Sequence, residues 1–366
     1  MRIQNSVFLI LLLANICASQ SVLAIKKAET DKTLQSIHKK QQNVGLSAAI
    51  FHRGKLVYSD GIGYANLEYK IPVMRDTKFQ VASVTKAFTG AALIKLHEDG
   101  KIDLNADIRK YIPNYPQKGI TPNLLAAHLA GIRHYKQGEK TAQFLSNNYS
   151  DLNEAIKIFK EDDLLSEPGT KYQYTSFGYN LLALTIQNAA KKRFDKYIQD
   201  EIIDSLDLRN TRFNDVRFVI GKRSSHYSFF DPLTFKPSKE ILRVPDFDYS
   251  YNMGGGNIIT TSEDLAKFGQ VFTMKGLFSV KALEMFYRRQ DEKSPWSYGW
   301  FVPKEPEKTG KRLHITGAFP GVQASLYVYP DDGLSIAIIS NTWGIGSNSG
   351  EMVSTVPEKI AEIWLD

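Results

Sequence analysis

A serine and a lysine three residues apart could supply a nucleophile and its proton acceptor. Ser83-Val84-Thr85-Lys86 opens an apolar, helix-like stretch. At this spacing the hydroxyl and the amine share one helix face. A lysine held against an apolar helix loses hydration, which lowers its pKa, so it could take the serine proton or stabilise another base. The alternative is that Ser83 caps the helix and Lys86 points to water.

The same spelling occurs a second time in the chain. Ser36-Ile37-His38-Lys39 lies on a polar helical stretch with charged neighbours. That setting favours a solvated helix face, so Ser83 is the preferred nucleophile.

Ser83 belongs to one of six stretches that follow one another along the chain in a familiar order. They are Gly63–Glu68, Phe79–Lys86, Leu124–Ile132, Pro168–Tyr174, Gly254-Gly255-Gly256 and Pro320-Gly321. From about residue 35 onward, this order resembles the class C beta-lactamase and D-Ala-D-Ala carboxypeptidase family of serine hydrolases. His128–Tyr135 and Lys171–Leu182 are most similar to its mitochondrial serine beta-lactamase-like members.

The resemblance implies a fold and two roles. The fold is α/β (α+β): an antiparallel sheet flanked by helices, with an inserted, mostly helical domain and a site in the cleft between them. Ser83 would accept the acyl group, and Lys86 would share its proton.

The family's second element is Tyr-x-Asn, and its positional match here is Tyr174-Thr175-Ser176. Tyr174 would be the general base, although a free phenol titrates near 10 and needs nearby cations such as Lys86. Ser176 replaces the asparagine and offers one donor instead of two. The alternative is that Tyr174 is a packed aromatic residue. A literal copy, Tyr64-Ala65-Asn66, precedes the serine in a loop-like setting and is interpreted as structural.

The family's third element is Lys or His, then Thr or Ser, then Gly, on a strand beside the serine. Lys308-Thr309-Gly310 matches this pattern literally, but its flanking residues are those typical of a turn. His314-Ile315-Thr316-Gly317 misspells it but precedes Ala318 and an apolar strand, as in the family. We therefore expect Thr316, Gly317 and the Ala318 N–H to contact the substrate and its oxyanion. His314 joins the site only if a bulge re-aims it, and a structural histidine is the alternative.

Strands at both ends of the chain would position these residues. Expected elements are strands at Gly45–His52, Lys55–Tyr58, Tyr298–Val302, Arg312–Ile315, Gln323–Tyr329 and Leu334–Ser340, a helix from Ser83 to Gly100 and a last helix at Pro357–Leu365. Shorter helical stretches are Leu124–Leu129, Leu152–Phe159, Tyr179–Ala190 and Asp195–Ser205. We predict one α/β domain from residues 25–104 and 262–366, with residues 105–261 inserted as a helical domain.

Residues 1–24 resemble a cleavable secretory signal. Arg2 precedes the apolar run Val7–Leu13, and Val22-Leu23-Ala24 ends with the small residue that a signal peptidase needs. Cleavage after Ala24 would remove the single cysteine, Cys17, and leave no membrane span. The expected location is then periplasmic or secreted. The alternative is an uncleaved membrane anchor.

Composition and motifs together predict an exported serine hydrolase. The chain has 366 residues, 43% hydrophobic, with a net charge of +7 from scattered basic residues, so no nucleic-acid partner is expected. Substrates would be small peptides, cell-wall peptides, esters or beta-lactams, cleaved through an acyl-enzyme without a metal or other cofactor. Alternatives are an esterase or acyltransferase on this scaffold, or a weakly catalytic protein that binds peptides or self-assembles.

Overall fold

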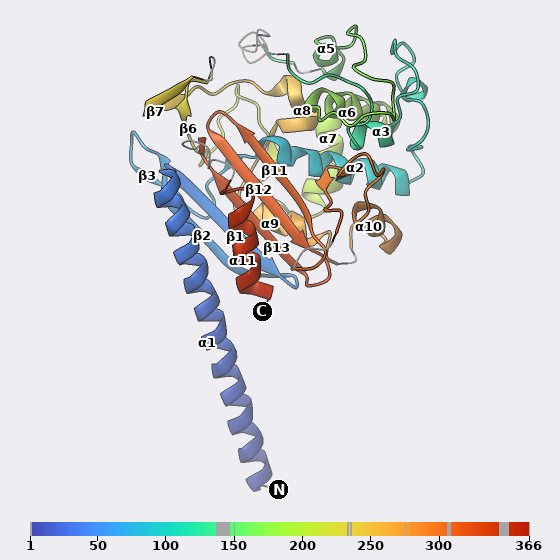
Figure 1. Cartoon of the computed structure of the whole chain (residues 1–366). Helices are drawn as coiled ribbons and strands as arrows, with labels where there is room; N and C mark the ends of the chain where they lie inside the picture. The colour runs from blue at the N-terminus through green and yellow to red at the C-terminus, as the bar shows by residue number, and fades with distance from the viewer. Residues whose placement is uncertain are drawn as a thin grey trace.

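In the computed structural model, strands from the N-terminal and the C-terminal parts of the chain form one sheet, with a region rich in short helices to one side (Figure 1). The structure describes residues 2–136, 147–149, 151–232, 234, 236–274, 276–305, 309–343 and 351–365, with side chains from residue 20 onward.

The main sheet is antiparallel and has eight strands in the order β3-β2-β1-β13-β12-β11-β10-β9. Its N-terminal strands are β1 (Gly45–His52), β2 (Lys55–Asn66) and β3 (Ile71–Pro72). Its C-terminal strands are β9 (Trp296–Ser297), β10 (Trp300–Phe301), β11 (Leu313–Phe319), β12 (Val322–Tyr329) and β13 (Leu334–Ser340). The two sets meet where β1 pairs with β13, for example Ala48 with Ile338.

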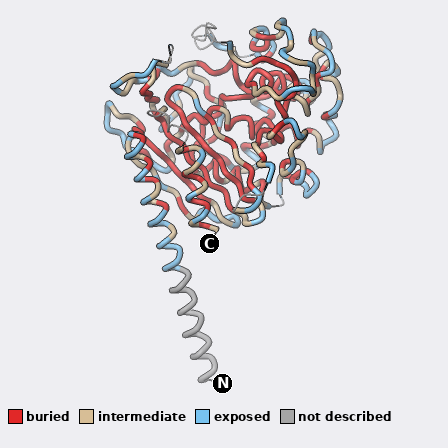
Figure 2. The backbone as a smooth tube through the Cα atoms, in the orientation of Figure 1, coloured by how far each residue is buried: buried red, intermediate tan, exposed pale blue. Residues whose placement is uncertain are grey.

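Apolar side chains bury both faces of this sheet, which explains why β12 and β13 are buried along their whole length (Figure 2). One face packs on α1 (Arg2–Gln41) and α11 (Thr355–Leu365) through Leu34, Ile37 and Trp364. The other face packs on α2 (Thr85–Glu98) and α9 (Ser262–Gln270). The sheet therefore separates two apolar cores.

The region between the two halves of the sheet carries short helices. They are α3 (Pro122–Ala126), α5 (Leu152–Ile156), α6 (Ser176–Ala190), α7 (Phe194–Ile198) and α8 (Met253–Gly256), with α10 (Val280–Phe286) after α9. It also carries strands β5 (Arg212–Phe213), β6 (His226–Phe230), β7 (Pro237–Val244) and β8 (Ile258–Thr260). β8 pairs with β4 (Phe79–Gln80) and β5, while β6 pairs with β7 and β14 (Thr342–Trp343).

Local chemistry explains several element boundaries. The hairpin between β1 and β2 turns at Arg53 and Gly54, which both have positive φ, as a type I′ turn requires. Thr261 caps α9 by accepting a hydrogen bond from the Asp264 N–H.

The expected fold class is confirmed, with two local corrections. Tyr64-Ala65-Asn66 ends strand β2 instead of lying in a loop. β6 and β7 occupy a stretch expected to be irregular. The division into two domains stays a prediction.

α1 leaves the body of the molecule toward the N-terminus (Figure 1). Its C-terminal part is attached by Thr30, whose Oγ accepts from Trp364 Nε1 at 3.0 Å, and by Asp31, which accepts from the Tyr58 hydroxyl at 2.6 Å. Among the helices that the structure describes, none has the length and apolar character needed to cross a membrane.

Candidate active site

Ser83 lies in a short 3₁₀ turn, Ala82–Val84, that leads directly into α2. Ala82 before it has a φ of 47°, a left-handed conformation that costs free energy in a residue with a side chain. The N-cap residue of α2 is Val84, which makes no side-chain cap. The alternative in which Ser83 serves as the helix cap is therefore wrong.

Lys86 is 0% exposed and makes three polar contacts. Its Nζ donates to Ser83 Oγ at 3.1 Å, to Ser176 Oγ at 3.1 Å and to the Gly255 carbonyl oxygen at 2.9 Å. Burial lowers the pKa of Lys86, and the nearby Tyr174 hydroxyl opposes that shift. The alternative in which Lys86 points to water is wrong.

The contacts of Lys86 suit both of its protonation states. An ammonium group has three N–H donors, one for each contact. A neutral amine can keep its two N–H groups on Gly255 and Ser176 and direct its lone pair at the Ser83 hydroxyl. A proton could therefore pass from Ser83 to Lys86 without movement of the lysine.

Tyr174 reaches the same serine from the chain before α6. Its hydroxyl donates to Ser83 Oγ at 2.9 Å, and Lys86 Nζ lies 5.0 Å from its ring centroid. The ring also packs on His128 and Trp296, with centroids 4.5 and 5.4 Å away. Tyr174 is thus both a packed aromatic residue and a polar neighbour of Ser83.

Two histidines that were not predicted as site residues hold the backbone N–H groups of Thr175 and Ser176, next to Tyr174. His128 Nδ1 accepts the Thr175 N–H at 3.2 Å, and His134 Nδ1 accepts the Ser176 N–H at 3.3 Å. Thr175 Oγ1 completes the arrangement by accepting the Gly178 N–H at the start of α6. Both histidines lie within His128–Tyr135, a stretch that resembles the family, and that was the available signal.

Burial and nearby cations keep these imidazoles neutral. Burial first, then Lys86 and Arg133, lowers the pKa of His134 to about 4. Burial, then Lys86 and His134, lowers the pKa of His128 well below its usual value. A neutral imidazole that accepts at Nδ1 carries its proton on Nε2. Each ring can therefore keep accepting its backbone N–H near neutral pH.

β11 passes beside the nucleophile turn, and Gly317 is its point of approach. A Cβ added to Gly317 would lie 2.2 Å from the Val81 carbonyl oxygen and 2.9 Å from the Ser83 nitrogen. Only glycine allows this distance. Ala318, whose N–H is expected to polarise the substrate carbonyl, follows directly and is exposed.

His314 does not reach this site, so that part of the prediction is wrong. β11 pairs with β12 in unbroken register from Leu313 to Phe319, with no bulge to re-aim a side chain. His314 stacks on Tyr327 with ring centroids 4.8 Å apart. Burial and Arg312 lower its pKa to about 3. It is a structural histidine on the sheet face away from Gly317.

Ile315 and Thr316, the two residues after His314, face opposite sides of the sheet. Ile315 fills the place of the family's cation and is buried in the core beside α2. Thr316 alternates to the His314 face, is half-buried and pairs with Ser325 across the strands. A role for the Thr316 hydroxyl in holding substrate stays a prediction.

The rival motifs lie elsewhere or outside the described residues. Ser36 and Lys39 are exposed on α1, as expected for a solvated face. Lys308 of the literal Lys-Thr-Gly lies outside the described residues. Within the described part of the chain, no cluster of histidine, cysteine or acidic residues is arranged to hold a metal.

Comparison with known proteins agrees with this geometry. The sequence model of the beta-lactamase family matches residues 30–351. The chain is 25% identical to the human (Homo sapiens) serine beta-lactamase-like protein LACTB, mitochondrial, over 83% of this chain and 74% of that protein.

Two solved structures share the fold. One is EstCE1, a hydrolase with promiscuous acyltransferase activity, with a TM-score of 0.76 and 18% identity over 95% of this chain and 100% of that chain. The other is the D-amino acid amidase of Ochrobactrum anthropi SV3 complexed with L-phenylalanine amide. Its TM-score is 0.75, with 20% identity over 92% of this chain and 97% of that chain.

Proposed function

The chain belongs to the beta-lactamase family of serine hydrolases, and on that premise we propose that it cleaves small amides or esters through an acyl-enzyme on Ser83. The observation that carries the proposal is the convergence of Lys86 Nζ and the Tyr174 hydroxyl on Ser83 Oγ, at 3.1 and 2.9 Å. A nucleophile within hydrogen-bond reach of its proton acceptor is the arrangement that acyl transfer needs.

In the acylation step Ser83 Oγ bonds to the acyl carbon and its proton passes to Lys86 Nζ. The carbonyl oxygen takes the negative charge, held by the N–H groups of Ser83 and Ala318. As the C–N or C–O bond breaks, the leaving amine or alcohol recovers a proton from the Lys86–Tyr174 pair. Water then attacks the acyl carbon and gives its proton to that pair. The bond to Ser83 Oγ breaks as the pair returns the proton to Ser83, and a carboxylic acid leaves.

The substrate we propose carries no carboxylate beside the scissile bond. The family places a lysine or histidine at the position that Ile315 occupies, and a cation there would pair with a carboxylate. Ile315 is buried and His314 faces the other side of the sheet. The amide in the D-amino acid amidase complex likewise lacks a free carboxylate by its name. Amino-acid amides and short esters therefore suit this cleft better than penicillins or D-Ala-D-Ala.

Active-site labelling tests the nucleophile directly. A fluorophosphonate should add one adduct to the native protein, read by intact mass, and none to Ser83→Ala. Ser36→Ala is the matched control and should label like the native protein. Labelling that survives Ser83→Ala, or its absence from the native protein, would overturn the assignment.

An esterase or acyltransferase activity is the second candidate. Ser176 supports it, because its hydroxyl offers a substrate amide one donor, whereas the asparagine at this position of the family would offer two. Rates on p-nitrophenyl esters, D-amino-acid amides and D-Ala-D-Ala peptides, with and without an added alcohol, would separate these candidates. Transfer to the alcohol identifies an acyltransferase.

We also propose that the chain is exported and cleaved after Ala24. The first 24 residues support this by their sequence, and hydrogen bonds that attach α1 to the rest of the molecule come from residues beyond them, Thr30 and Asp31. N-terminal sequencing of the protein from a periplasmic fraction should begin at Ile25. A cytosolic product that retains Met1 would contradict the proposal.

A further inference from the structure

A hollow of about 470 Å³ lies beside α8, and Ser83, Lys86 and Tyr174 are not among its lining residues. Met253 at the start of α8 and Asn257 just after it both line the hollow. We call it the α8 hollow. The Gly255 carbonyl between those two residues accepts from Lys86, so this short helix borders both the hollow and the active site.

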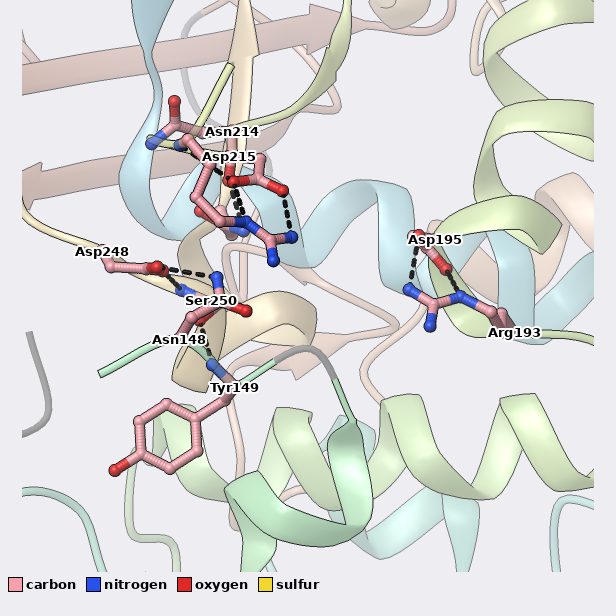
Figure 3. Close-up of polar contacts among 10 residues, drawn as sticks. Asn148, Tyr149, Arg193, Asp195, Asn214, Asp215, Asp248 and Ser250 are labelled. Carbon is pink, nitrogen blue, oxygen red and sulfur yellow. Dashed lines mark hydrogen bonds and ion pairs between the residues drawn. The ribbon is translucent and has the colours of Figure 1, made fainter. Parts of the chain in front are cut away.

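The α8 hollow is lined from two directions. Figure 3 shows Arg193 and Asp195 on one side and Asn214 and Asp215 on the other. Below Asn214 and Asp215, Asp248 accepts hydrogen bonds from Asn148 and from the Ser250 N–H, at 2.8 Å each (Figure 3). That carboxylate is therefore already occupied by neutral donors.

The lining holds five basic side chains, Arg193, Lys196, Arg209, Arg212 and Arg217. Four of them pair with carboxylates: Arg193 with Asp195, Lys196 with Asp200, Arg209 with Asp207 and Arg217 with Asp215. Among the residues that the structure describes, Arg212 is the lining cation left without a carboxylate partner, and such a cation on a concave surface attracts anions.

Arg217 and Arg212 keep N–H donors that an anion can use. Arg217 binds Asp215 in a two-pronged contact at 2.9 and 2.6 Å, which uses two of its five N–H donors. Arg212 is exposed and makes no ion pair or side-chain hydrogen bond with any residue that the structure describes. The hydrogen bonds from Arg217 are the main cause that lowers the pKa of Asp215, and the Arg212 guanidinium adds to the effect, so Arg212 and Asp215 lie within electrostatic range.

Apolar side chains complete the lining. Phe213, Phe218 and Met253 line the same hollow, and Phe218 is well exposed. The Arg217 guanidinium lies 5.8 Å from the Phe218 ring centroid. The lining therefore offers a planar cation for oxygen anions next to an apolar surface.

From this combination we propose that the α8 hollow binds an organic phosphate, meaning a phosphate group that carries an apolar or aromatic substituent. Guanidinium groups match phosphate oxygens in charge and geometry. Arg212 and Arg217 bind the phosphate, and Phe213 and Phe218 contact the substituent.

Calorimetry with phenyl phosphate tests the proposal. The Ser83→Ala protein is used, so that binding is measured without the catalytic serine and independently of the proposed activity. Phenyl phosphate should bind more tightly than inorganic phosphate, which lacks the ring, and benzylamine should not bind. Arg212→Glu should weaken binding about tenfold or more, the loss of one charge-assisted contact.

Lys55→Glu is the matched control, because Lys55 is exposed on β2 and does not line the hollow. It should leave binding unchanged while making the same change in charge. Failure of phenyl phosphate to bind at millimolar concentration, or equal binding by Arg212→Glu and Lys55→Glu, would overturn the proposal.

The phosphate could belong to a soluble ester or to a lipid headgroup. Flotation with vesicles containing phosphatidic acid, compared with phosphatidylcholine vesicles, separates the two sources. Flotation that Arg212→Glu abolishes identifies a lipid headgroup. Phenyl phosphate binding without flotation identifies a soluble ester.

Discussion

At the residue scale, the chemistry depends on where the proton of Lys86 lies. Burial favours the neutral amine, while Tyr174 and the three acceptors around Nζ favour the ammonium. Because burial prevails, the pKa of Lys86 is lowered, and the neutral fraction grows as pH rises through that lowered pKa. Labelling of Ser83 should therefore become faster as pH rises.

Lys86→Met should remove this proton acceptor while keeping the volume of the side chain. We expect the rate of fluorophosphonate labelling to fall about 10²- to 10⁴-fold and to lose its rise with pH. Lys39→Met in the exposed Ser-x-x-Lys copy should leave both unchanged. Labelling rates measured from reactions quenched at several pH values check this prediction. A native labelling rate in Lys86→Met would contradict it.

The His314→Gln variant tests whether the side chain of His314, on the sheet face away from Gly317, contributes to catalysis. We expect kcat/KM to stay near the native value, because His314 stacks on Tyr327 and does not approach Ser83. Stability should fall by about 1 kcal/mol from lost packing. Tyr174→Phe should show the opposite pattern, with kcat reduced and stability kept. Urea unfolding and initial rates measure both, and a large kcat loss in His314→Gln would place the histidine in the site after all.

Fixed spacing explains which site residues could be predicted. Ser83 and Lys86 share one helix face, so sequence alone relates them. Tyr174 was located by its family context. His128 and His134 act through backbone contacts, and a histidine's tautomer and partner depend on the folded chain. The sheet face on which the His314 side chain lies depends on whether β11 contains a bulge. The residue types of the strand do not determine whether it does.

At the element scale, α2 is pressed against the turn that follows β9. A Cβ added to Gly90 would lie 1.7 Å from the Tyr298 carbonyl oxygen, and one added to Gly299 would lie 2.2 Å from the Lys86 carbonyl oxygen. Close backbone contact on this side fixes α2, which carries Lys86 and directly follows the turn that carries Ser83.

Gly90→Ala should therefore destabilise the protein, although alanine is the better helix former. Overpacking of this kind costs about 1–3 kcal/mol. Gly221→Ala, where a Cβ would meet nothing within 4 Å, should be neutral. Chemical unfolding of the two variants provides the comparison, and equal stabilities would show that the helix shifts freely.

The elements that could be predicted are those with strong local patterns. β1 has its predicted bounds, and β12, β13 and α11 lie within a few residues of theirs. β6 and β7 were not predicted. β7 is mostly exposed and begins at Pro237, so it lacks the alternation that identifies a strand. β5 and β8 are short, and they depend on distant partners: β8 pairs with β4, and β5 pairs with β8.

At the scale of the whole molecule, four histidines are held neutral. Burial lowers the pKa of His134 and of His226 to about 4, that of His314 to about 3, and that of His128 well below its usual value. In the unfolded chain each would titrate near 6.5. Their stabilising contribution is complete above that pH, and it is lost as pH falls toward the folded values.

The melting temperature should therefore fall steadily between about pH 6.5 and pH 4, because the unfolded chain binds more protons there. Differential scanning fluorimetry across that range measures it. His314→Gln should show a shallower fall than the native protein. A melting temperature that stays flat over this range would contradict the assignment of these imidazoles as neutral.

The position of β1 has a consequence for biosynthesis. β1 lies between β2 and β13, and its partner residues on β13 are 334–340. A ribosome makes β1 early and β13 near the end, so β1 keeps an open edge through most of translation. The nascent chain cannot close its central sheet until residue 340 has left the ribosome. The pairing edge of β1 toward β13 therefore stays open through nearly all of the synthesis of the chain.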